Sequence, residues 1–226
     1  PDDDNIGSLF SSNDEIRIGA GWSGGNRLDG VVDDVRFYDR ALSAAEISGL
    51  YTAGTGGGGG GGGGSGTYRD EFNAKSYSGS DGTLTWSTDW LEIGESDGAT
   101  SGDEQVRSDS GFNYVLRVRD NDNGGEGVQR EADLSDCSDA DLTFDYRRKS
   151  FDNSNDYVTV DVSANGGSSW TELDRLAGPA NESTYQSASY DISSAMAANT
   201  RIRFLTSSTL GGSDELFVEN VEISCL

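Results

Sequence analysis

Apolar and polar residues alternate in short segments throughout residues 67–226. Clear examples are Leu142–Tyr146, Val158–Val162 and Ile202–Phe204. A period of two residues is typical of strands that bury one face, and turns rich in Gly, Asn, Asp and Ser separate the segments. The strands predicted in this way are Tyr68–Phe72, Leu84–Trp86, Trp90–Ile93, Tyr114–Arg119, Gly127–Asp133, Asp141–Arg147, Asp156–Ser163, Trp170–Leu176, Tyr185–Asp191, Thr200–Thr206 and Glu215–Ser224.

A helical period is almost absent from this region, where only Ser193–Ala198 is expected to form a helical turn. Many short strands joined by polar turns predict an all-β fold, an antiparallel β-sandwich of jelly-roll type.

The pattern before residue 54 is also that of strands. Glu15–Ala20 alternates, and after a turn-rich stretch Leu28–Tyr38 forms a second predicted strand. Ser43 and Glu46 then make a capping box, which predicts the start of a short helix.

Nine consecutive glycines, Gly56–Gly64, separate these two regions. Such a run has no side chains to bury and loses much conformational freedom on ordering, so it is expected to act as a flexible tether. The chain is therefore divided into residues 1–53, a linker at 54–66, and a module at 67–226.

Short motifs follow one another in the N-terminal region: Ile18-Gly19, Gly30–Tyr38, Arg40–Ser43 and Glu46-Ile47. In this order they resemble the closing part of bacterial laminin-G-like (concanavalin-A-like) domains. Two strands and one helix cannot close a sandwich core. Pro1–Ala53 is therefore expected to be the C-terminal fragment of such a domain, in a chain that is itself a fragment or a processed product.

The region after the linker carries Asp70-Glu71-Phe72 at its start, Trp86 and Asp89-Trp90, the hairpin Asp156–Trp170, and the final segment Asp214–Ile223. Together these features resemble jelly-roll modules of bacterial carbohydrate-binding and MAM-like type, although the cysteine pattern departs from that of typical MAM domains. The resemblance implies a structural calcium ion between the opening segment and the last strand, which would engage Asp70 and Asp214.

A second candidate calcium site is the loop Asp120–Gly127, in which Asp120 and Asp122 alternate with other residues before two glycines. Calcium prefers six to eight oxygen ligands from a tightly turned chain. Position five of an EF-hand would be Gly124, and strands flank the loop, so a true EF-hand is rejected. A hairpin turn rich in Asn and Gly remains an equal alternative.

Charge and composition restrict the possible functions. The net charge is −24, which disfavours nucleic acid and anionic membranes as partners. The sequence has no histidine, so a Ser-His-Asp triad or a histidine-ligated metal is excluded. The Glu-x-Asp-x-x-Glu strand of concanavalin-A-like hydrolases is absent, and Glu92 and Glu95 do not reproduce it. We therefore expect a protein that is not an enzyme.

Cys137 and Cys225 are the two cysteines, and we expect them to form a disulfide in an extracellular protein, with two unpaired thiols as the alternative. No apolar run is long enough to cross a membrane. The module is expected to be monomeric within a longer chain.

Sugar binding needs aromatic faces with flanking polar groups. The candidates are Trp86, Trp90, Tyr77, Tyr185 and Tyr190, together with Arg147 and Arg148 of the basic cluster Arg147–Lys149. Each aromatic residue could instead belong to the core, and the cluster could be a local charge balance.

These observations predict a non-catalytic carbohydrate-binding or adhesion module of a secreted bacterial multidomain protein, with a polysaccharide or cell-surface glycan as partner. The alternative is a calcium-stabilised structural or protein-interaction spacer of an extracellular adhesin.

Overall fold

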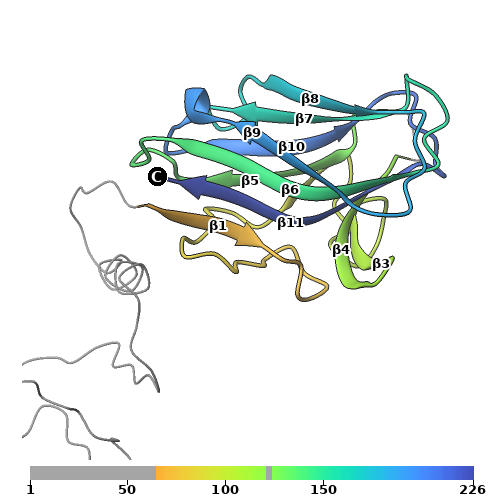
Figure 1. The fold of residues 1–226 in the computed structure, drawn as a ribbon, viewed down its shortest axis with the longest axis horizontal. Coiled ribbons are helices and arrows are strands. Elements are labelled where there is room, and N and C mark those ends of the chain that lie inside the picture. Colours follow the sequence, from red (N-terminus) through yellow and green to blue (C-terminus); the bar gives the residue numbers. More distant parts are fainter. Residues whose placement is uncertain (1–64, 121–123) are drawn as a thin grey trace, which may run out of the picture. The chain divides into compact units, whose positions relative to one another are not determined.

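The strands after the glycine tract form two antiparallel sheets that pack face to face (Figure 1). A computed structural model describes residues 65–120 and 124–226. The first sheet consists of β1 (Gly66–Asp70), β3 (Gln105–Asp109), β4 (Phe112–Val118), β6 (Ala140–Lys149), β9 (Gln186–Asp191) and β11 (Glu215–Cys225). The second sheet consists of β2 (Leu91–Ile93), β5 (Gly127–Ala132), β7 (Tyr157–Ser163), β8 (Thr171–Ala177) and β10 (Thr200–Thr206).

The strand order is that of a jelly roll. The first sheet runs β3-β4-β11-β6-β9, with β1 also paired to β11, and the second runs β2-β5-β10-β7-β8. From β4 onward the chain crosses between the sheets at every connection except the hairpin β7–β8. The eight strands β4–β11 therefore give the two four-stranded sheets of a jelly roll, and the predicted fold class is confirmed.

The core lies between the sheets and follows the predicted alternation. Leu142 and Phe144 of β6 point inward, as do Val160 of β7 and Phe204 of β10, and all four are buried. The rings of Phe144 and Phe204 meet edge to face at 5.1 Å, so aromatic contacts join the two sheets.

Most predicted strands are present, with shifts of a few residues at their ends. Thr200–Thr206 has the predicted bounds, and the helical turn is a 3₁₀ helix, η1 (Ser193–Ala195). The prediction was wrong for Leu84–Trp86, where Leu84 makes only a single bridge to Tyr68. It missed β3, in which Val106 is the one buried apolar residue.

The loop after β4 is not a hairpin turn. It connects β4 of the first sheet with β5 of the second, so the hairpin alternative for Asp120–Gly127 is wrong. Asp122 lies outside the described residues.

The disulfide between Cys137 and Cys225 is present, with an S–S distance of 2.02 Å. It ties the end of β11 to the turn before β6, so the prediction of a bridge is confirmed. Among the described residues, no helix has the length and apolar character needed to span a membrane. The predictions for Pro1–Ala53 lie outside those residues, and β1 begins at Gly66, the last residue assigned to the linker.

Candidate functional site

Strand β11 has a gap in its pairing along one edge. Strand β4 pairs with β11 as far as Val218, and β1 pairs with it only from Val221 onward. Between them lie Glu219 and Asn220, where the register with β6 on the opposite edge also shifts. Asn220 has a φ of 55°, a left-handed conformation that asparagine tolerates better than most residues, and its Oδ1 accepts a hydrogen bond from Arg69 Nε at 2.8 Å. A bulge therefore separates the two strands that share this edge.

A cavity of about 420 Å³ lies at this gap. It is lined by the end of β1, the tip of the β3–β4 hairpin and the bulge, through Glu71, Phe72, Asn73, Gly111, Phe112, Tyr114 and Glu219. Phe112 is 39% exposed, and its ring contacts that of Tyr185 edge-on at 4.9 Å. Tyr114 is half-buried. The cavity thus combines an exposed aromatic ring with carboxylate and amide groups.

The polar groups of the cavity are partly fixed by neighbours. Glu71 forms an ion pair with Arg69 at 2.7 Å, and Asn73 Nδ2 donates to Asp81 Oδ1 at 3.1 Å. Burial raises the pKa of Glu219, and the carboxylates of Asp145 and Glu71 raise it further. Glu219 therefore offers a partly desolvated hydrogen-bonding group.

A second cavity of about 390 Å³ lies over β6 and β9. Asn220 and Asp145 line it, and Asp145 is the register partner of Glu219. Its remaining lining comes from β6 and β9: Thr143, Phe144, Ser187, Ala188 and Ser189. The residues on the two sides of the bulge, Glu219 and Asn220, therefore line different cavities.

The tryptophans predicted to bind sugar belong to the core instead. Trp86 is 6% exposed and Trp90 is 2% exposed. Trp90 stacks against Phe72 at 6.3 Å, and its Nε1 donates to Asp70 Oδ2 at 3.0 Å. A ring that is enclosed on both faces cannot pack against a sugar, so the prediction is wrong for these two residues.

The tyrosines have different surroundings. The hydroxyl of Tyr185 donates to Asp109 Oδ2 at 3.0 Å beside Phe112, so Tyr185 supports the rim of the first cavity. The Tyr190 hydroxyl donates to Asp174 Oδ2 at 2.7 Å. The Tyr77 hydroxyl donates to Glu92 Oε1 at 2.9 Å, next to the acidic loop after β2.

Successive side chains of β6 point to opposite faces of the sheet, so the members of the basic cluster lie on different faces. Arg147 lies over the ring of Phe217 at 4.8 Å and forms a two-point contact with Asp109, at 2.9 and 2.5 Å. Arg148 points to the other face, where it pairs with Glu182. Each guanidinium group already has a carboxylate partner, so the structure does not bring Arg147 and Arg148 together in one site.

The predicted calcium site at Asp70 and Asp214 does not form. Asp70 pairs with Val221 in the β1–β11 register, whereas Asp214 precedes the start of β11. Seven residues along a strand correspond to roughly 20 Å, too far for one ion to contact both carboxylates. Asp70 is instead the ion-pair partner of Arg130, at 2.6 Å.

Asp214 and Asp120 each accept a hydrogen bond from a neighbouring group. Asp214 Oδ2 accepts the Gly211 N–H at 2.9 Å, and burial, together with Asp156 and Asp152, raises its pKa. Asp120 is buried and accepts a hydrogen bond from Thr206 Oγ1 at 2.9 Å.

The site residues predicted from sequence did not include Phe112, Tyr114, Asn73 or Glu219. A signal was present for Phe112, because it directly follows Ser110-Gly111 and a hairpin tip exposes its side chains. Nothing local marked Glu219, since its position depends on where two distant strands stop pairing.

Comparison with known proteins gives one family match. Residues 3–48 match the concanavalin A-like lectin/glucanases superfamily, in agreement with the resemblance of the N-terminal motifs. This match covers less than half of the chain. No curated protein sequence matches the chain.

Solved structures with a similar arrangement have low sequence identity. The xylan-binding domain of carbohydrate-binding module family 22 gives a TM-score of 0.46 at 10% identity, covering 70% of this chain and 93% of its own. A family 29 carbohydrate-binding module complexed with mannohexaose gives a TM-score of 0.45 at 12% identity, covering 71% of this chain and 92% of its own. The K1 cleaved adhesin domain of Lys-gingipain from Porphyromonas gingivalis W83 gives a TM-score of 0.45 at 15% identity, covering 71% of this chain and 98% of its own. These similarities assign no ligand to this chain.

Proposed function

We propose that the jelly-roll module binds a polysaccharide, without catalysis, in the cavity between β1 and β4. The observation that carries this proposal is the exposed ring of Phe112 at the edge of a mainly polar cavity. A sugar ring has apolar C–H faces and a rim of hydroxyls, so an aromatic face with carboxylate and amide groups is complementary to it.

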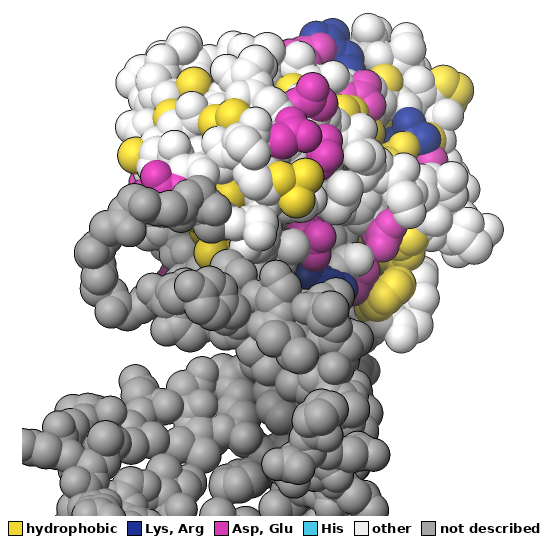
Figure 2. All heavy atoms as spheres, turned by 60° about the vertical axis from the view of Figure 1, so that its left-hand side comes forward, with side chains coloured by type: hydrophobic (Ala, Val, Ile, Leu, Met, Phe, Trp, Pro, Cys, Tyr) yellow, Lys and Arg dark blue, Asp and Glu magenta, His cyan; other side chains and the backbone are white. Residues whose placement is uncertain are grey.

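The charge of the described surface favours a neutral polysaccharide over an acidic one. Acidic side chains form a band across the face shown in Figure 2, where basic side chains are few. Arg147 and Arg148 are paired with carboxylates, as are Arg201 and Arg203 at 2.7 and 2.8 Å. An anionic glycan would meet repulsion and few available cations.

The proposal includes an extracellular, multidomain setting. The disulfide supports an oxidising compartment. The glycine run and the N-terminal family match support a second domain joined by a flexible tether, which would let the module search for polysaccharide around its anchored neighbour.

The test is a binding panel of neutral and acidic polysaccharides with the full chain, measured by calorimetry and by retention on insoluble polymers. F112A is expected to weaken binding about tenfold, since a planar ligand face packed on an aromatic ring, as a nucleobase does, contributes about 1–3 kcal/mol. The matched control is L91A, because Leu91 is 42% exposed and lies away from the cavity. A wild-type chain that binds no polysaccharide, or that loses affinity equally in both variants, would refute the proposal.

A second candidate function is that of a structural spacer. It is favoured by the burial of Trp86 and Trp90, which leaves fewer aromatic faces for a ligand than the sequence suggested. A spacer would bind nothing in the panel, so the same experiment separates the two functions.

A further inference from the structure

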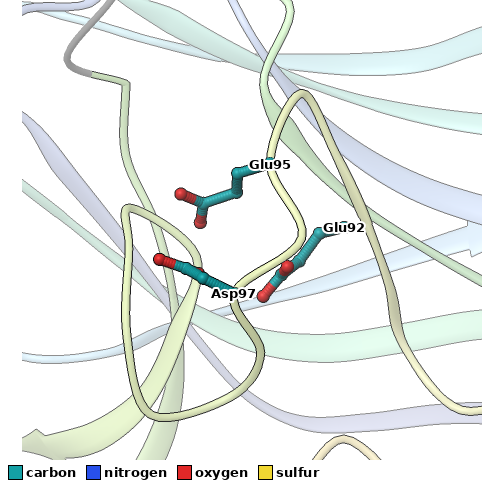
Figure 3. A group of neighbouring side chains, drawn as sticks. All are labelled: Glu92, Glu95 and Asp97. Atoms are coloured by element: carbon teal, nitrogen blue, oxygen red, sulfur yellow. The ribbon is translucent and has the colours of Figure 1, made fainter.

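The loop that follows β2 gathers three carboxylates. Glu92 lies in β2, and Glu95 and Asp97 follow it in the loop. Their side chains converge, and one oxygen from each lies within 4.8 Å of the other two (Figure 3). Like charges at such distances repel, so the fold must hold them together.

Backbone donors hold two of these carboxylates in place. Glu95 accepts the N–H of Asp103 at 2.9 and 3.0 Å, and the N–H of Glu104 at 2.6 Å. Glu92 accepts the N–H of Gly98 at 3.2 Å. The loop therefore closes on its own acidic side chains, which are positioned before any ligand binds.

Gly102 permits the close approach. Its φ is +71°, and a Cβ atom here would lie 2.3 Å from a Glu95 oxygen and 2.4 Å from Asp97 Oδ1. Any larger residue here would displace one or both carboxylates.

A fourth carboxyl group lies beside this cluster without a hydrogen-bond donor. Glu104 is fully buried, and in the described part of the chain neither of its carboxylate oxygens has a hydrogen-bond partner. It faces Glu95 and lies near the carboxylates of Glu126 and Asp103. A buried carboxyl group in this position requires either a proton or a cation.

Neighbouring groups do not supply that cation. Arg117 acts on Glu95 through its charge, but its guanidinium donates to the carbonyls of Gly102, at 2.7 Å, and Asp103, at 3.2 Å. The Tyr77 hydroxyl lies 2.9 Å from Glu92 Oε1 and 2.8 Å from the Glu104 carbonyl, so it supports the loop as a neutral group.

We propose that Glu92, Glu95 and Asp97 bind a calcium ion, with the buried Glu104 beside Glu95 as a further acidic group. Three carboxylates offer up to six oxygens, and water can complete the six to eight ligands that calcium takes. The flexible geometry of calcium suits mixed one- and two-oxygen contacts better than the strict octahedron of magnesium. This site is separate from the Asp70 and Asp214 positions and independent of the polysaccharide cavity. Glu92 belongs to β2 of the second sheet, and Glu95 is held by the backbone just before β3 of the first, so the ion would stabilise the loop that connects the two sheets.

The test uses the full 226-residue chain after removal of metal with EDTA. Calorimetric titration with calcium chloride is expected to show one site, and calcium is expected to raise the midpoint of thermal unfolding more than sodium chloride of equal ionic strength. Asp97 is exposed, so D97N should fold like the wild type while weakening calcium binding at least tenfold. D136N is the matched control, since Asp136 is an exposed acid outside the cluster.

A second variant, E104Q, tests the same site at a different residue. E104Q relieves the repulsion beside Glu95, so it should raise the unfolding midpoint of the metal-free chain and reduce the calcium-dependent rise. The proposal is overturned by a wild type that binds no calcium at pH 7, which would mean that a proton on Glu104 resolves the repulsion. Unchanged calcium affinity in D97N, or an unchanged calcium-dependent rise in E104Q, would also overturn it by placing the ion elsewhere.

Discussion

The carboxylate of Asp70 and the guanidinium of Arg130 meet at 2.6 Å in the interior, and the pair joins the two sheets. Asp70 ends β1 of the first sheet, and Arg130 lies in β5 of the second. Arg130 also lies over the rings of Trp86, at 4.6 Å, and Trp90, at 5.6 Å. The residues predicted as a metal ligand and as sugar platforms thus form one buried network.

Removing one partner of this ion pair should destabilise the protein strongly. R130M leaves the Asp70 carboxylate buried without its cation, and we expect a loss of about 3–5 kcal/mol in the free energy of unfolding. Urea denaturation followed by tryptophan fluorescence measures it.

The double variant D70N/R130M should lose less than the sum of the two single variants, because it leaves no uncompensated charge. The exposed pair Arg175–Glu172, at 2.8 Å, is the control, and R175M should change stability little. A small effect of R130M would mean that water reaches Asp70.

The disulfide should contribute substantially to stability because it closes a long loop. Cys137 and Cys225 are 88 residues apart, and the chain-entropy account predicts about 4–5 kcal/mol for such a loop. We expect C137S/C225S to lower the free energy of unfolding by about 2–5 kcal/mol in urea titrations. Dithiothreitol should lower the stability of the wild type toward that of the variant and leave the variant unchanged; an equal effect on both would contradict the prediction.

Glu215 should make stability depend on pH in the acid range. Burial alone would raise its pKa, but Lys149, Arg117 and Arg107 outweigh burial and hold the pKa below the usual 4.5. A carboxylate with a lowered pKa stabilises the folded state fully above its unfolded value and loses this contribution as pH falls. The stability difference between wild type and E215Q should therefore be largest above about pH 5 and shrink below pH 4.5. A difference that stays constant from pH 6 to pH 3 would show that the charge of Glu215 has no such role.

The fold was more predictable from the sequence than the sites were. Ile202–Phe204 alternates in sequence, and the burial of β10 alternates in the same way, so local alternation was sufficient to place this strand and its buried face. β3 was missed because its contacts come from pairing with β4 and not from its own apolar residues.

The site residues depended on partners far away in the sequence. Asp70 looked like a metal ligand because its partner, Arg130, lies 60 residues later. Phe112 and Glu219 reach one cavity only because β4 and β1 share an edge of β11. The acidic loop did leave a local signal, the three acids Glu92, Glu95 and Asp97 close to Gly94 and Gly98, but the neighbouring Glu104 becomes evident only from its burial.

The bulge at Asn220 should control both the stability of β11 and the shape of the cavity. N220G accepts the positive φ, whereas in N220V a branched side chain meets a cost of about 1–2 kcal/mol in the left-handed region. Both variants lose the hydrogen bond to Arg69, so a comparison between them does not include that contribution. In urea denaturation we expect the free energy of unfolding of N220V to be about 1–2 kcal/mol lower than that of N220G. The polysaccharide that binds the wild type in the binding panel should bind N220G with similar affinity and N220V more weakly. Equal stability would mean that β11 can straighten at this point without cost, and the cavity would then not depend on the bulge.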